Sequence, residues 1–363
     1  MISNMAKKDH NNCITIAKAI GIILMVIGHS GCPQLLFKSI YLFHMPLFFF
    51  CSGIFHKEMT SSEAVILFLK KRIKGLYVPF VKWSVFFLFL HNLLMLVGIY
   101  NPYYGYEGGS SFYTLSDVFQ KLFLIMFTMH DYEELLGGFW FIRALFITSV
   151  LMAIFSILLK KVSRNKYYLL CLLSLLLTVV IRRIAPEIEF WRDISMGTFG
   201  AFFYMSGYLL MRYKSYWHNK YGATLCCFIM FLSYLYFKDG VSMGCGYNKV
   251  VTFSITAVSG TLFTIYISSA IESRLQIIRR ILYYIGNHTL DILALHFLSF
   301  RLVSFVIVLL YGINVSHVAE HPVIKDVSIS HEYWWILYCT IGIVLPLLLG
   351  AAWKVIMIKI KRS

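Results

Sequence analysis

Long apolar runs, separated by short polar and basic connections, make up most of this chain of 363 residues. Most of the runs approach the roughly 20 residues that an α-helix needs to cross a lipid bilayer. Ten runs fit this description, although 167–183 and 221–238 are marginal in length: 12–31, 35–56, 76–99, 137–160, 167–183, 192–212, 221–238, 250–271, 283–312 and 333–358. The pattern predicts an all-α membrane protein with about ten transmembrane helices.

The basic residues of the connections orient these helices. If the N-terminus lies in the cytoplasm, every second connection is rich in lysine and arginine, as the positive-inside rule requires of cytoplasmic segments. The sequence therefore predicts an N-in/C-in bundle. The same distribution accounts for the net charge of +16, which in a soluble chain would suggest nucleic-acid binding. We expect membrane lipids, and no nucleic acid, as partners.

Composition supports a membrane protein, because 59% of the residues are hydrophobic and only 14% are charged. Soluble domains carry about 25% charged residues. No small-residue cleavage site follows the first apolar run, so we interpret 1–11 as a short cytoplasmic tail ahead of a retained helix. The whole chain, 1–363, is expected to form a single polytopic domain.

Two connections are long enough to contain structure of their own. The cytoplasmic connection 57–75 is predicted to form an amphipathic helix capped by Ser61 or Ser62. The outer connection 100–136 begins with a region rich in tyrosine, glycine and proline. It then carries a short apolar piece, Val118 to Met129, that is either re-entrant or lies on the membrane surface, because it is too short to span.

The first span contains two ionisable residues, Lys18 and His29. They are eleven positions apart, which at about 100° per residue places them on one stripe of the helix. Ionisable side chains inside a membrane segment are costly and usually functional. The structural alternative is that Lys18 extends to one interface while His29 is hydrated at the other.

The second span carries His44 at a depth similar to that of His29. Because the connection between the two spans is short, we expect an antiparallel hairpin in which the two histidines face each other. His44 has the structural alternative of a ring bonded to a backbone carbonyl. No metal site is expected, because two histidines are too few ligands. The string His317-Val-Ala-Glu320-His321 resembles a metalloprotease motif but lies in a short loop before Pro322.

A basic cluster lies at the cytoplasmic end of the third span and comprises Lys70, Lys71, Arg72 and Lys74. Such a cluster binds either lipid headgroups or the phosphates of a nucleotide-bearing substrate. Near the outer end of the fourth span, Trp140 and Arg143 are further candidates for binding substrate or donor, although an arginine there usually extends to a headgroup.

The ninth span contains an unusual concentration of polar side chains. Asp291 is the one acidic residue that the pattern places inside a span, and Asn287 would share its helix face at four residues' distance. The group predicts the lining of a cavity rather than simple packing. Its members are Asn287, His288, Asp291, His296 and Arg301.

Five of these segments, taken in order, resemble motifs of the bacterial acyltransferase-3 integral membrane proteins, in particular the branch similar to fucose O-acetylases. The likeness covers residues 14 to about 300. It includes Lys18-x10-His29, the second-span segment Phe43 to Phe55, the basic segment Lys70 to Phe80, the string GFWFIRALF around Trp140, and Tyr284 to Phe297.

This resemblance implies an O-acetyltransferase of the bacterial inner membrane. Acetyl-CoA would be the donor substrate, with no permanently bound cofactor, and the acceptor would be a sugar hydroxyl of a cell-surface or lipid-linked glycan. His29 matches the family's proposed catalytic histidine, Lys18 the basic residue of the same motif, and Arg72 the basic residue before the third helix. Histidine suits a base for acyl transfer near neutral pH.

The chemistry of acyl transfer, and not the resemblance, suggests the remaining site residues. Phosphates of the donor would bind Arg72, Lys71 and Lys74, and an oxyanion would find donors in Asn287, His44 or Trp140. Arg143 and His296 complete the predicted binding set.

Two departures from the family pattern concern carboxylates. Many members have an aspartate where this chain has Thr15, and others carry a glutamate in the fourth-helix motif, where this chain has Ala144 and Leu145. Asp291 is therefore our candidate for orienting His29.

Two other functional classes remain open at this point. A transporter or flippase for a lipid-linked saccharide would also use polar groups inside the membrane, although no internal repeat supports it. A membrane scaffold would leave Lys18, His29 and Asp291 unexplained. The sequence leaves open a homo-oligomer, the side of the membrane on which the acceptor binds, and an acyl-enzyme mechanism.

Overall fold

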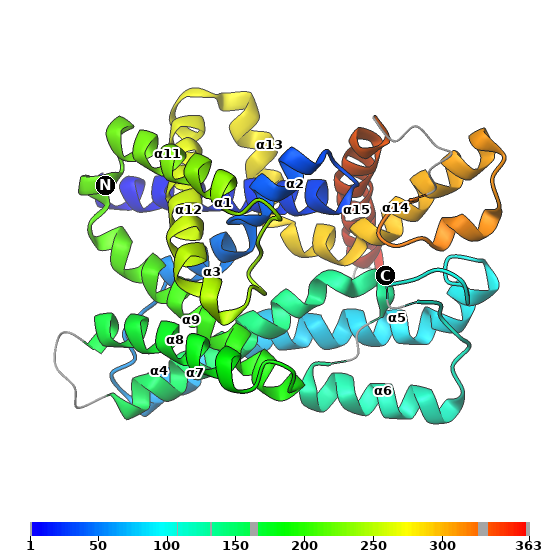
Figure 1. Ribbon diagram of the computed structural model, residues 1–363, viewed down its shortest axis with the longest axis horizontal. Helices are drawn as coiled ribbons and strands as arrows, with labels where there is room; N and C mark the ends of the chain where they lie inside the picture. Colours follow the sequence, from blue (N-terminus) through cyan, green and yellow to red (C-terminus); the bar gives the residue numbers. More distant parts are fainter. Residues whose placement is uncertain (1, 107, 131–132, 160–165, 326–332, 361–363) are drawn as a thin grey trace. The chain divides into compact units, whose positions relative to one another are not determined.

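The computed structural model describes residues 2–106, 108–130, 133–159, 166–325 and 333–360 (Figure 1). Within these ranges every regular element is helical, and nine helices are long and apolar enough to cross a membrane. The predicted all-α membrane class is confirmed. The marginal run 221–238 corresponds to the shorter apolar helix α11 (Lys220–Tyr236). Residues 160–165, which hold several basic residues of the predicted cytoplasmic connection after the fourth span, lie outside the described residues.

The chain folds as two compact units. Unit 1 comprises Met1–Leu24, Leu35–Leu76 and Phe141–Asn287, and unit 2 comprises Met25–Gln34, Tyr77–Trp140 and His288–Ser363. Helix α1 (Ile2–His29) supplies residues to both units. Residues 2–11, which were predicted to form a tail ahead of the first helix, are the N-terminal part of α1.

Unit 1 is built around α9 (Glu189–Arg212), which packs against α3 (His44–Ile54) and α8 (Lys166–Ile184). Helix α12 (Val250–Arg274) packs against α3 and α11. The remaining elements of this unit are α2 (Gln34–Tyr41), α4 (Ser62–Arg72), most of α7 (Trp140–Leu158), α10 (Lys214–Trp217), a 3₁₀ turn (Tyr247–Lys249) and α13 (Gln276–Asn287).

Two glycines allow α3 and α9 to approach until their backbones touch. A Cβ atom on Gly53 would lie 1.8 Å from the carbonyl oxygen of Tyr204, and one on Gly207 would lie 2.2 Å from that of Phe50. Both distances are far below van der Waals contact, so only glycine fits at either position. The contact fixes the height of Tyr204 relative to α3.

Unit 2 is built around α14 (Thr289–Tyr311), which packs against α15 (Trp334–Ile360) and two short 3₁₀ segments. These segments are η2 (Glu134–Phe139), just before α7, and η4 (Val315–Ala319), in the loop after α14. Helix α5 (Val78–Leu96) packs against α6 (Leu115–Thr128).

The second predicted span is interrupted, which corrects the prediction of one continuous helix over 35–56. Helix α2 ends at Tyr41 and α3 begins at His44. Pro46 explains the break, because a proline lacks an N–H donor and its ring collides with the carbonyl four residues earlier, at Leu42. His44 is therefore the first residue of a new helix.

The ninth predicted span, 283–312, is also two helices, and this overturns the expectation that Asn287 and Asp291 share a face. Asn287 ends α13, and Asp291 lies in the first turn of α14. Glycine and asparagine are weak helix formers, which favours an end at Gly286-Asn287. Gly286 also packs directly on α1, since a Cβ there would lie 2.1 Å from the Thr15 carbonyl oxygen.

The predicted cytoplasmic helix in 57–75 is present as α4. Ser61 caps it, because its hydroxyl accepts a hydrogen bond from the Ala64 N–H. A π-helical turn, Ile73–Tyr77, then joins α4 to α5, so that Ser62–Leu96 is one helical stretch of 35 residues.

The apolar piece of the outer connection forms α6, which lies antiparallel along α5 (Figure 1). At one end, the Asn92 side chain exchanges hydrogen bonds with the backbone of Tyr113. At the other end, the Tyr77 hydroxyl donates to the Met126 carbonyl at 2.6 Å. Helix α6 thus follows most of the length of a candidate spanning helix, and the choice between a re-entrant and a surface-lying segment stays a prediction.

Candidate active site

His29 lies at the C-terminal end of α1, in unit 2, where it contacts two aromatic rings of α14. Its ring centroid is 5.7 Å from that of His296 and 5.1 Å from that of Phe297. The structure thus brings together two of the predicted site residues, His29 and His296. They are separated by 267 positions in the sequence.

The hydrogen bonds of His296 define which ring nitrogen carries its proton. Nδ1 lies 3.1 Å from the Ile292 carbonyl and 3.0 Å from the Leu293 carbonyl, so it donates. In a neutral ring this leaves Nε2 as an acceptor. That atom is buried and has no hydrogen-bond partner among the described residues. An unused acceptor therefore lies within the histidine cluster.

A buried ion pair borders the same cluster, and the sequence did not reveal it. Arg301 on α14 donates to the Glu134 carboxylate at 2.8 Å, and both side chains are less than 10% exposed. Arg301 also donates to the carbonyls of Val318 and Glu320. It thereby holds η2 and the η4 loop against α14.

His321, at the end of the metalloprotease-like string, is held in this network. Its ring lies 4.5 Å from that of Phe297, and its Nδ1 lies 3.8 Å from Glu134. Burial, together with the nearby Arg301 charge, lowers the pKa of His321 to about 2, so the ring is neutral. Phe297 therefore contacts both His29 and His321.

The residues of the metalloprotease-like string make separate contacts. His317 pairs with Glu320 at 3.4 Å, three residues away, rather than with His321. Across the described residues no group of three histidine, cysteine, aspartate or glutamate side chains could hold a metal ion.

Asp291 packs against α15, where a Cβ on Gly350 would lie 3.0 Å from its carboxylate oxygen. Its predicted role as the carboxylate that orients His29 stays a prediction, as does the role of Trp140 at the start of α7. The neighbouring His288 is 2.6 Å from the Lys354 ammonium.

In unit 1, four predicted residues have defined structural partners. Lys18 lies close enough to the Cys51 thiol of α3 to interact electrostatically with it. The ring of His44 bonds to the Ile40 carbonyl at 2.9 Å, which is the structural alternative considered for it. Arg143 forms an ion pair with Asp193 at 2.6 Å. Asn287 donates to the Tyr283 carbonyl.

The predicted pairs Lys18–His29 and His29–His44 each join residues of different units. His29 belongs to unit 2, whereas Lys18 and His44 belong to unit 1. The expectation that His29 faces His44 therefore stays a prediction.

Arg72, at the end of α4, is the most highly connected residue of the predicted basic cluster. It donates to the Ser52 and Tyr204 hydroxyls at 3.1 and 3.3 Å. Lys71 and Lys74 are exposed. The cluster thus consists of one hydrogen-bonded guanidinium and exposed lysines, an arrangement that suits the binding of phosphate.

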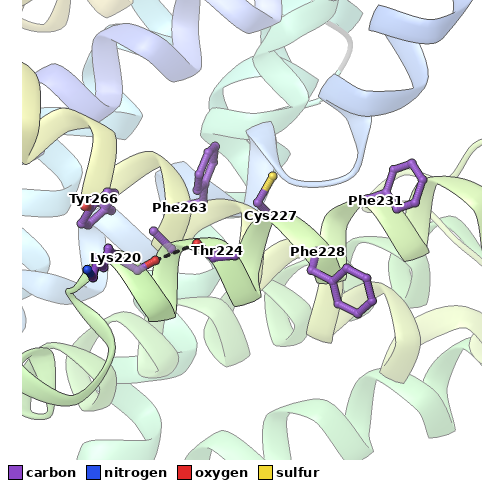
Figure 2. A pocket seen from close by; sticks show the side chains of 8 residues that line it. Lys220, Thr224, Cys227, Phe228, Phe231, Phe263 and Tyr266 are labelled. Carbon is purple, nitrogen blue, oxygen red and sulfur yellow. Dashed lines mark hydrogen bonds between the residues drawn. The ribbon is translucent and has the colours of Figure 1, made fainter.

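A pocket of about 640 Å³ lies on α11 and α12 in the same unit (Figure 2). Figure 2 shows Phe228 and Phe231 along α11 and Lys220 at one end. Its wall is largely aromatic and aliphatic, and it contains none of the predicted site residues.

Comparison with known protein families decides the class. A family model described as an acyltransferase domain, that of the acyltransferase-3 proteins, matches residues 11–353. The chain belongs to the acyltransferase-3 family. It is accordingly a membrane acyltransferase, which supports the enzymatic interpretation over the scaffold. A search of curated proteins and a search of solved structures each found no match.

This acyltransferase contains functional candidates that sequence reasoning did not assign to the site. Glu134, Tyr204 and His56 were not named at all, whereas Arg301 and His321 were noted without such a role. Glu134 precedes its span and was counted with the outer connection. The one available signal was its position directly before the Gly137-Gly138-Phe-Trp string of the family motif.

Proposed function

We propose that this protein moves an acetyl group from cytoplasmic acetyl-CoA to a sugar hydroxyl of a cell-surface or lipid-linked glycan at a bacterial inner membrane. The observation that carries the proposal is the contact of His29 with His296, beside the buried Glu134–Arg301 pair. A base, an acceptor that orients it and a water-poor wall are what acyl transfer to a hydroxyl requires.

In this mechanism His29 removes the proton of the acceptor hydroxyl while that oxygen attacks the thioester carbonyl carbon. The tetrahedral intermediate then collapses, the C–S bond breaks, and the proton passes from His29 to the departing sulfur. No net proton is released, and the products are the sugar ester and CoA.

His296 supplies the orienting contact that the family pattern assigns to a carboxylate. Its unused Nε2 acceptor can take the N–H of His29 after a small adjustment of either ring. The opposite nitrogen of His29 then keeps its lone pair for the acceptor hydroxyl. A nitrogen acceptor stabilises the imidazolium less than a carboxylate does, so Asp291 remains a second candidate.

On the donor side, Arg72 with Lys71 and Lys74 would bind the phosphates of the CoA nucleotide. An oxyanion would find a donor in the Trp140 indole N–H. Arg143 we assign to the packing of α7 on α9, because Asp193 pairs with it.

The test uses the purified protein in detergent with radiolabelled acetyl-CoA, comparing wild type with His29→Ala. We expect wild type to hydrolyse acetyl-CoA slowly and release CoA. The rate of CoA release by His29→Ala should be lower by a factor of at least about a hundred, while both proteins bind CoA equally well. His288→Ala is the matched control, since its ring is engaged with Lys354.

Equal CoA release by wild type and His29→Ala would contradict His29 as the base. If neither protein binds or hydrolyses acetyl-CoA, the proposed donor is wrong, and the acyl group must come from another donor.

A further inference from the structure

The guanidinium of Arg72 is held on three sides within unit 1. Its two terminal nitrogens donate to the Ser52 and Tyr204 hydroxyls, and its central carbon lies 5.0 Å from the centroid of the Phe68 ring. The side chain is therefore fixed in one orientation before any ligand binds. A preorganised arginine loses less entropy on binding a phosphate than a free one does.

Tyr204 also forms a hydrogen bond with a second residue, His56. Its hydroxyl oxygen accepts from Arg72, so its own proton is available for His56 Nδ1, which lies 3.1 Å away. Burial, together with the Arg72 charge, lowers the pKa of His56 to about 4, so the ring is neutral near pH 7. With Nδ1 accepting, the ring proton must be on Nε2.

The position of Nε2 points to a ligand or a bound water. This N–H group is buried and has no hydrogen-bond partner in the described parts of the chain. Buried donors are rarely left unpaired. His56 itself is only 7% exposed, so the unpaired donor belongs to a built site and not to a mobile surface side chain.

The backbone contact of α3 with α9 places Tyr204 where its hydroxyl can bond to both Arg72 and His56. Gly53 follows Ser52 directly and touches the Tyr204 carbonyl. The same close approach therefore brings the Ser52 and Tyr204 hydroxyls to Arg72 together. Tyr208, one turn further along α9, also packs its ring against His56, at 5.1 Å between centroids, but its hydroxyl bonds to Glu58 and Arg212 instead. Replacing it by phenylalanine keeps the ring contact and removes only the hydroxyl's bonds.

We infer that Tyr204 is a positioning residue, which together with His56 orients Arg72 to bind a phosphate group of the acyl donor. This inference rests on the proposed function, because it takes the donor to be a coenzyme A thioester. It adds that the affinity for the donor's nucleotide end depends on a hydroxyl that does not itself touch the phosphate.

The test compares Tyr204→Phe with the control Tyr208→Phe in the full-length protein, using acetyl-CoA and S-acetylpantetheine. The latter carries the same thioester without the nucleotide phosphates. We expect Tyr204→Phe to raise KM for acetyl-CoA about tenfold, the effect of one charge-assisted hydrogen bond, with kcat changed less than about twofold. Tyr208→Phe should leave KM unchanged.

Two further readouts separate positioning from a merely structural role. Both wild type and Tyr204→Phe should use S-acetylpantetheine equally well. In an Arg72→Ala background, Tyr204→Phe should cause no further rise in KM, because the two residues act as one unit.

An unchanged KM in Tyr204→Phe would overturn the inference, as would an equal loss with both donors or additive effects with Arg72→Ala. Failure of the proposed function is distinct from these outcomes, because wild type itself would then turn over neither donor.

Discussion

The Glu134–Arg301 pair offers a direct test of how the candidate site is held together. The two charged groups lie 2.8 Å apart, and their side chains are 8% and 2% exposed. Glu134→Gln keeps the size of the side chain but leaves the Arg301 charge without its buried counter-ion. Removing one partner of a buried pair costs about 3–5 kcal/mol of folding free energy.

The free cysteines of the protein supply the assay. Most of the eight thiols are buried, so a thiol-reactive fluorescent dye reports thermal unfolding in detergent. At about 2 °C per kcal/mol for a chain of this size, Glu134→Gln should lower Tm by roughly 6–10 °C. The matched control is Glu189→Gln, whose partner Arg192 lies 3.8 Å away with both side chains more than half exposed. Its Tm should shift by less than about 1 °C.

A double variant separates charge burial from packing. Glu134→Leu with Arg301→Met buries no charge and should recover part of the lost Tm. Recovery should stay incomplete, because Arg301 also donates to the Val318 and Glu320 carbonyls. The reasoning is refuted if Glu134→Gln melts with wild type, or if the double variant melts below Glu134→Gln.

Two further predictions concern unit 1. Gly53→Ala places a Cβ 1.8 Å from the Tyr204 carbonyl and should abolish accumulation of folded protein or lower Tm by more than 5 °C, roughly the effect of forced overpacking. Gly75→Ala, which meets nothing within 4 Å, should behave as wild type, and equal Tm values for the two variants would contradict the close packing. The lowered pKa of His56 means that the unfolded chain binds a proton between about pH 6.5 and 4 that the folded chain does not, so stability should fall on acidification through that window. In dye-reported melts, His56→Gln should lose less Tm than wild type between pH 7 and pH 5, and an identical loss in both would exclude His56 as a contributor.

Much of the fold follows from local signals in the sequence. Hydrophobic run lengths predict the membrane helices, and Ser61 predicts the start of α4. The two interrupted spans were predictable in principle. Pro46 and the Gly286-Asn287 pair are local breakers, but each lies inside a run of membrane-spanning length, which was interpreted as one helix.

The candidate site depends on contacts that no local signal encodes. Lys18-x10-His29 led to His29, and the polar ninth span led to His296. Glu134, however, meets Arg301 across 167 positions, and Arg72 meets Tyr204 across 132. Tyr204 lies within the predicted span 192–212 and Glu134 within the outer connection, and nothing in either neighbourhood indicates the distant arginine that each contacts.

The antiparallel pairing of α5 and α6 affects how the topology of this protein can be mapped by experiment. His91 of α5 stacks on Tyr113, which precedes α6, and donates to Glu133, which follows α6. The chain therefore contacts the same residue of α5 before and after α6. A reporter protein fused to a chain truncated at Thr128 would report the side of the membrane on which the C-terminal end of α6 lies. That end is beside Tyr77, at the N-terminal end of α5. With a re-entrant α6, such a fusion would count one crossing too many between α5 and α7. Epitope tags inserted into the full-length chain avoid this error, because the contact of Glu133 with His91 is kept.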